Sequence, residues 1–219
     1  MPSLYTAISL AEELSNANEG EPCVPDLLQQ GFRVLQILME ASVEFSPRAY
    51  SIAVLQNALL ERSITYAELS MRMGEDVANA VQLLTPSPQE RGLLLSSVSS
   101  INRVLLAAPH YPELPAIAIA ICIYELEQHP TQRAEDIDAC ITSAYEWLIP
   151  RMEHHLLGLP ATMQSALEAL LYLLRYRLME AKRKIKTCYT GERHEHQTPV
   201  LRLREYRLPA PAPRLVAHP

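Results

Sequence analysis

The chain has 219 residues, of which 48% are hydrophobic and only 6 are glycine, and its formal net charge is −6. This length and composition suit one domain with a substantial core plus an extension. Its four cysteines are widely spaced and form no Cys-x-x-Cys pair, so no disulfide framework is implied.

Helix is the secondary structure predicted along the chain. Apolar residues recur at three- and four-residue steps in the segments 4–14, 27–41, 50–61, 67–73, 76–84, 97–108, 114–128, 134–155 and 162–186. Prolines punctuate these segments where helices are expected to start and stop. The segment 117–123 is β-branched enough to be mistaken for a strand, and we interpret it as a central buried helix.

The N-terminus shows no targeting or membrane-spanning pattern. Glu12 and Glu13 lie within the first predicted helix, and no basic start precedes an apolar run. Neither a secretory signal nor a membrane anchor fits this pattern. We therefore expect a cytoplasmic protein without a membrane span.

Three short blocks carry a family resemblance. Residues 25–29 read Pro-Asp-Leu-Leu-Gln, residues 58–62 read Ala-Leu-Leu-Glu-Arg, and residues 118–126 read Ala-Ile-Ala-Ile-Cys-Ile-Tyr-Glu-Leu. In order and spacing they resemble the Pro-Tyr-x-x-His, Ala-Leu-Leu-His-Asp and Lys-Leu-Ala-Asp-x-Leu-x-Asn-Leu blocks of the HD-superfamily (p)ppGpp hydrolases, the SpoT-type hydrolase domain. The resemblance implies an all-α, HD-domain-like helical bundle, which we place at residues 1–178.

The same alignment implies that the metal site of the family is lost. The positions of the metal ligands fall on Gln29, Glu61, Arg62 and Ile121. Glutamine is a poor ligand, isoleucine is none, and the guanidinium of Arg62 places a permanent positive charge where the cation would sit. We therefore expect no catalytic residue, no bound metal and no cofactor.

Substrate binding by the family mechanism is also disfavoured. Residues 1–174 hold 8 arginines, no lysine and 21 acidic residues, a balance of −13 that would repel a polyanion. Arg72 and Arg103 are the candidates for a local cationic cluster that could still bind a nucleotide. The alternative without a binding role is that each side chain lies on a solvated helix face or forms an ion pair.

The C-terminal segment 179–219 is predicted to be a basic extension rich in Pro and Arg. All three lysines lie there, and residues 175–219 carry a balance of +7. We expect the last helix to continue to Lys186 and the remainder to be extended or disordered. The candidate partner-binding residues are Arg175, Lys182, Lys184, Lys186, Arg202 and Arg204. Nucleic-acid binding is disfavoured because aromatic residues are sparse and no glycine loop is present.

The leading hypothesis is a catalytically inactive, HD-like protein that acts through a protein partner or as a homo-oligomer, with a role in regulating alarmone or nucleotide metabolism. Two alternatives stay open. In one, a rebuilt Mn²⁺ site uses Glu61, Glu68 and Glu125 or Glu127 with His110 or His129 to hydrolyse (p)ppGpp or another nucleotide. In the other, the old cleft serves a nucleotide-binding sensor.

Overall fold

The computed structural model describes residues 3–17, 27–41, 45–59, 64–86, 97–128 and 134–190, without the side chains of 134–137 and 186–190. Within these ranges the regular secondary structure is helical and includes no strand, which confirms the all-α prediction there. None of the described helices is both long enough and apolar enough to cross a membrane.

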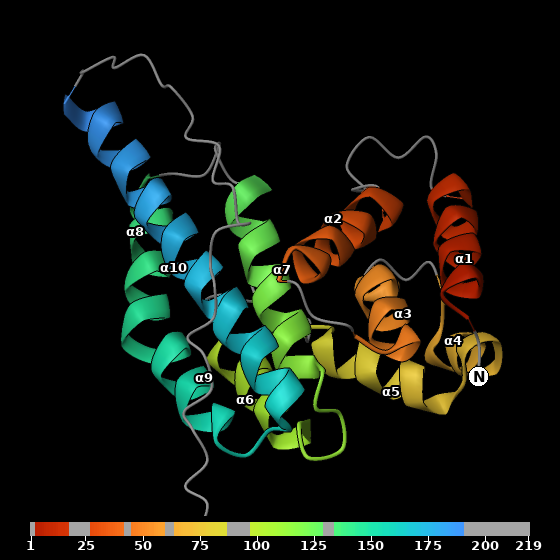
Figure 1. Cartoon of the computed structure of the whole chain (residues 1–219). Coiled ribbons are helices and arrows are strands. Elements are labelled where there is room, and N and C mark those ends of the chain that lie inside the picture. The colour runs from red at the N-terminus through yellow and green to blue at the C-terminus, as the bar shows by residue number, and fades with distance from the viewer. Residues whose placement is uncertain are drawn as a thin grey trace, which may run out of the picture.

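The helices pack side by side around a single apolar core (Figure 1). Each segment predicted from apolar periodicity overlaps a helix of the structure. In chain order these are α1 (Leu4–Ala17), α2 (Leu27–Glu40), α3 (Pro47–Leu55), α4 (Tyr66–Met73), α5 (Glu75–Leu84), α6 (Val98–Ala107), α7 (Leu114–Gln128), α8 (Ala134–Ser143), the π-helical turn η2 (Ala144–Leu148), α9 (Ile149–Leu156) and α10 (Ala161–Thr190).

Helix α7 is the centre of the core. Every residue from 114 to 123 is buried, on all sides of the helix. A helix that is apolar all round must be covered all round. Its cover comes from α2, α3, α5, α6 and α10, with α2 and α3 on the side of α7 away from α10 (Figure 1). The interpretation of segment 117–123 as a buried helix is confirmed.

Helix α3 begins earlier and ends earlier than the periodicity predicted. The Ser46 hydroxyl accepts a hydrogen bond from the Ala49 amide at 3.2 Å, and Pro47 follows at the first helical position. Both are typical start signals, and proline needs no amide partner there. After Leu55 the chain turns, and the side-chain amide of Asn57 donates from Nδ2 to Oε1 of Gln30 in α2 at 2.5 Å. This contact joins the end of α3 to its neighbour.

The segment 134–155 was predicted as one helix and is instead interrupted by η2. The Ile149 amide donates to the Ala144 carbonyl, which is the wider hydrogen-bond step of a π-helix. Pro150 explains the interruption because it has no N–H and its ring would clash with the carbonyl of Glu146 in a regular helix. One extra residue in the turn removes that clash.

Helix α10 packs along α7, α8 and α9. It extends to Thr190, so the predicted continuation of the last helix through residue 186 is present and residues 179–190 of the expected extension are helical. Residues 191–219, for which an extended or disordered chain was expected, lie outside the described residues.

Candidate functional site

The positions aligned with the family's metal ligands fall in different surroundings. Gln29 is exposed on α2. Ile121 is 5% exposed and belongs to the buried surface of α7. Glu61 and Arg62 lie outside the described residues. The two described positions thus face solvent and core respectively.

The two arginines proposed as ligand-binding residues contact other parts of the chain. Arg72 of α4 donates from Nη1 and Nη2 to the carboxylate of Glu13 in α1, at 3.0 and 2.5 Å. Arg103 of α6 donates to the main-chain carbonyls of Leu83 and Thr85, at 3.2 and 3.1 Å. Arg72 thus links α4 to α1, and Arg103 caps the C-terminal end of α5.

The candidate partner-binding cations of α10 are only partly described. Arg175 forms an ion pair with Glu153 of α9. Lys182 and Lys184 are exposed. The backbone of Lys186 belongs to α10 but its side chain lies outside the description, as do Arg202 and Arg204 altogether.

Two of the carboxylates considered for a rebuilt metal site, Glu68 and Glu127, have structural partners. Glu68 accepts hydrogen bonds from the hydroxyl and the amide of Thr65 at 2.6 and 2.9 Å, and these bonds lower the pKa of Glu68. Glu127 is bound by Arg33 and Arg177. Over the described ranges, no group of three His, Cys, Asp or Glu residues is placed to hold a metal ion. His110 is exposed, Glu125 is half-buried, and His129 lies outside the described residues.

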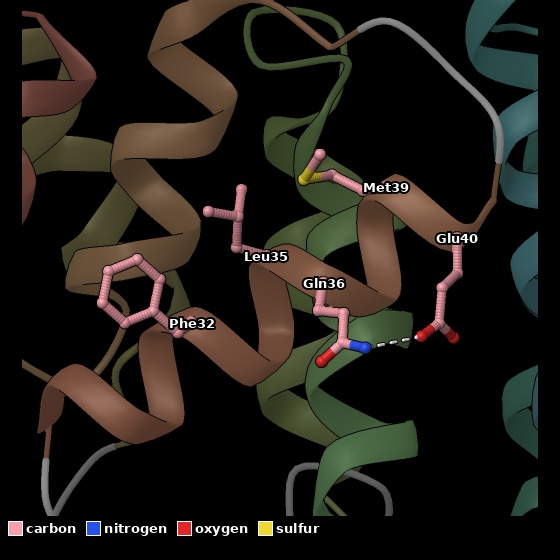
Figure 2. A pocket seen from close by; sticks show the side chains of 5 residues that line it. All are labelled: Phe32, Leu35, Gln36, Met39 and Glu40. Atoms are coloured by element: carbon pink, nitrogen blue, oxygen red, sulfur yellow. Dashed lines mark hydrogen bonds between the residues drawn. The ribbon is translucent and has the colours of Figure 1, made fainter.

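An open apolar groove follows the outer face of α2, and we call it the α2 groove. Its volume is about 470 Å³, and its lining residues are Phe32, Leu35, Gln36, Met39 and Glu40. Figure 2 shows Phe32, Leu35 and Met39 projecting to the same side of the helix, with Gln36 and Glu40 beside them. Met39 is 61% exposed and Phe32 is 40% exposed, so two large apolar side chains face solvent here.

Hydrogen bonds and ion pairs hold the polar side chains along one edge of the α2 groove. Gln36 donates to Glu40 at 3.0 Å (Figure 2). Arg33 donates from Nε and Nη2 to Glu127 of α7 at 2.8 and 2.9 Å, and its Nη1 lies 3.7 Å from Oε1 of Glu40. These contacts fix α2 against α7 and leave an apolar stripe with a carboxylate at one end. Such a stripe is suited to bind another apolar helix face.

A second hollow lies where η2 meets α9 and α6, and we call it the π-turn pocket. Its volume is about 440 Å³. The Arg151 guanidinium lies 5.0 Å from the centre of the Trp147 ring, and Arg151 Nη1 donates to Asn102 Oδ1 at 2.7 Å. The lining residues are Leu105, Glu146, Trp147, Pro150, Arg151, His154 and His155.

His155 contributes a buried polar atom to this pocket. Its Nε2 is buried and has no hydrogen-bond partner in the structure. Burial, together with the neighbouring His154, lowers the pKa of His155. The imidazole is therefore neutral near pH 7, with one nitrogen able to accept a hydrogen bond.

No protein-family model and no curated protein matches the chain. The α2 groove and the π-turn pocket were not singled out from the sequence. Phe32 and Met39 are seven residues apart and lie at the edge of the buried face of α2, next to Leu35, so helical periodicity could have placed them together. The sequence held one signal for the π-turn pocket, which is that Trp147, Pro150 and Arg151 lie within five residues of one another.

Proposed function

We propose that this chain is an interaction protein that lacks the hydrolase chemistry of the family it resembles and self-associates through the α2 groove. The observation that carries the proposal is the pair Phe32 and Met39, two exposed apolar side chains on one face of an otherwise well-packed helix. An HD-like origin, with a role in alarmone metabolism, is the setting that the sequence resemblance implies.

The absence of hydrolysis is supported by what occupies the ligand positions. The last metal-binding position of the family aligns with Ile121, whose aliphatic side chain belongs to the core of α7. It has no lone pair to offer a cation. The candidate phosphate-binding cations, Arg72 and Arg103, are bound to Glu13 and to main-chain carbonyls. A polyanion would have to break those contacts.

Self-association is supported by the symmetry of the exposed stripe. Phe32 and Met39 are two helical turns apart, or about 10 Å along the axis. When two copies of α2 pack antiparallel around a twofold axis near Leu35 and Gln36, each Phe32 faces the Met39 of the other copy. An isologous interface requires this self-complementarity, and sulfur-aromatic contacts are favourable.

The size and charge of this interface set its expected behaviour. One helix per copy buries less area than a standard stable interface, so the dimer should be in rapid, concentration-dependent exchange. Both copies carry the acidic balance of residues 1–174, so they repel each other at low ionic strength. Added salt screens this repulsion. Salt should therefore strengthen a dimer formed through α2, whereas it would weaken a dimer held by the basic C-terminal segment.

Sedimentation velocity of the full chain over a range of concentrations, at low and high salt, tests the proposal. We expect a monomer-dimer equilibrium that shifts toward the dimer as salt is added. Met39→Gln and Phe32→Gln should each weaken the affinity of the dimer about tenfold or more. Met71→Gln is the matched control, because Met71 is 80% exposed on α4 outside the groove. Turnover of (p)ppGpp with Mn²⁺ is measured on the same samples and should be absent.

Two results would contradict this proposal separately. A chain that stays monomeric at every concentration, or a dimer that Met39→Gln leaves intact, would remove the role of α2. Turnover of (p)ppGpp with Mn²⁺ would contradict the claim that the chain lacks hydrolase activity, whatever its state of association.

A further inference from the structure

The π-turn pocket places two opposite charges beside an apolar surface. Arg151 supplies a cation and Glu146 a carboxylate. Leu105 of α6 and the ring of Trp147 supply the apolar surface. Pockets that bind small molecules combine these properties, with mostly apolar walls and a few convergent polar groups, in volumes of about 300 to 1,000 Å³.

The cation of the pocket is held in place before any ligand binds. The Arg151 guanidinium lies over the Trp147 ring and donates one hydrogen bond from Nη1 to Asn102. A guanidinium has five N–H donors in a planar fork that matches a carboxylate. The remaining donors of Arg151 are therefore available to a carboxylate without reorganisation of the side chain.

One polar atom of the pocket lacks a hydrogen-bond partner. The Nε2 atom of His155 is buried without a hydrogen-bond partner. Buried polar atoms nearly always have partners, from protein, water or ligand. π-Helical turns also occur frequently at functional sites.

We propose that the π-turn pocket binds a free aromatic amino acid. The carboxylate of the ligand pairs with Arg151, its ammonium group pairs with Glu146, and its ring packs against Leu105 and Trp147. Both charges of the pocket are then neutralised, which neither a simple anion nor a simple cation would achieve. The proposal is independent of the α2 groove, which lies on another helix.

Trp147 makes the test direct, because it is the only tryptophan among the 219 residues. Its fluorescence, excited selectively over tyrosine, is followed while the full chain is titrated with phenylalanine. Three matched compounds each lack one group: phenylpropanoate has no ammonium, phenethylamine has no carboxylate, and alanine has no ring. We expect a saturable change with phenylalanine and binding about tenfold or more weaker for each of the three.

Variants separate binding in the pocket from binding elsewhere. Arg151→Gln should abolish discrimination between phenylalanine and phenethylamine, and Glu146→Gln discrimination between phenylalanine and phenylpropanoate. Glu168→Gln and Arg183→Gln, at exposed positions on α10, are the controls and should bind as the unmodified chain does. A fluorescence signal that phenylalanine does not saturate, or equal binding by all four compounds, would overturn the proposal. Circular dichroism verifies that each variant is folded.

Discussion

A single glycine sets the distance between two core helices. Gly31 lies on the buried face of α2, and α2 packs on α3 at this point. A Cβ atom added to Gly31 would lie against the main chain of Val54, 2.8 Å from its Cα. Backbone atoms cannot rotate away as a side chain can. The close approach of α2 and α3 therefore requires a residue without a side chain at position 31.

Gly31→Ala should lower the free energy of unfolding by about 1 to 3 kcal/mol, because the two helices must separate to admit the methyl group. Equilibrium urea denaturation followed by circular dichroism measures the loss. Gly158→Ala is the matched control, since a Cβ there would meet nothing closer than 3.7 Å. Equal stability of the two variants would show that α2 and α3 can adjust without cost.

At the scale of helices, local signals decide where each one begins. Helix α4 starts with a capping box: the Thr65 hydroxyl accepts from the Glu68 amide at 3.3 Å, and Glu68 accepts from the Thr65 amide at 2.9 Å. Two main-chain N–H groups that the helix cannot satisfy are paired in this way. The start of α4 is thus specified within four residues.

Thr65→Ala should cost about 1 kcal/mol of stability through loss of the N-cap oxygen. The effect should also depend on pH, because the hydrogen bonds from Thr65 lower the pKa of Glu68. A carboxyl group with a lowered pKa in the folded state stabilises it above its ordinary pKa of about 4.3, and this contribution is lost as the pH falls through the lowered value. The stability difference between the unmodified chain and Thr65→Ala should therefore shrink in acid.

Urea denaturation at a series of pH values measures this difference. Thr162→Ala serves as the control, since Thr162 is an exposed residue in the first turn of α10. A difference for Thr65→Ala that stays constant across the acid range would contradict the role of Glu68 in the cap.

The sequence predicted helices well because apolar periodicity is a local signal. It predicted α7 as a buried helix because apolar residues fill every face of segment 117–123. It missed η2, since the effect of Pro150 on a helix depends on whether the surrounding packing holds the helix together. It also left the partners of Arg72 open, because Glu13 is 59 residues away and no local pattern encodes such a pair.

At the scale of the molecule, one carboxylate joins three helices that are distant in sequence. Glu127 of α7 accepts from Arg33 of α2 at 2.8 and 2.9 Å and lies 3.0 Å from Nη2 of Arg177 in α10. The Glu127 side chain is only 17% exposed. Two guanidinium groups therefore share one half-buried carboxylate near the C-terminal end of α7.

Glu127→Gln should destabilise the fold by roughly 1 to 3 kcal/mol, because it leaves Arg33 and Arg177 close together with only Glu40 and Glu180 as acidic partners. The loss should stay below that of a fully buried pair, since Arg33 and Arg177 remain 28% and 30% exposed. Urea denaturation measures it, with Glu168→Gln as the surface control. A loss no larger than that of the control would show that the network contributes little.

The buried centre of the fold also has a consequence during synthesis. The ribosome releases the Ile- and Ala-rich segment of α7 well before α10, whose residues cover one side of it. Until then the nascent chain exposes a β-branched, uncharged stretch of the kind that aggregates or recruits chaperones. Codon choice and growth temperature should therefore affect how much of this protein reaches its native state.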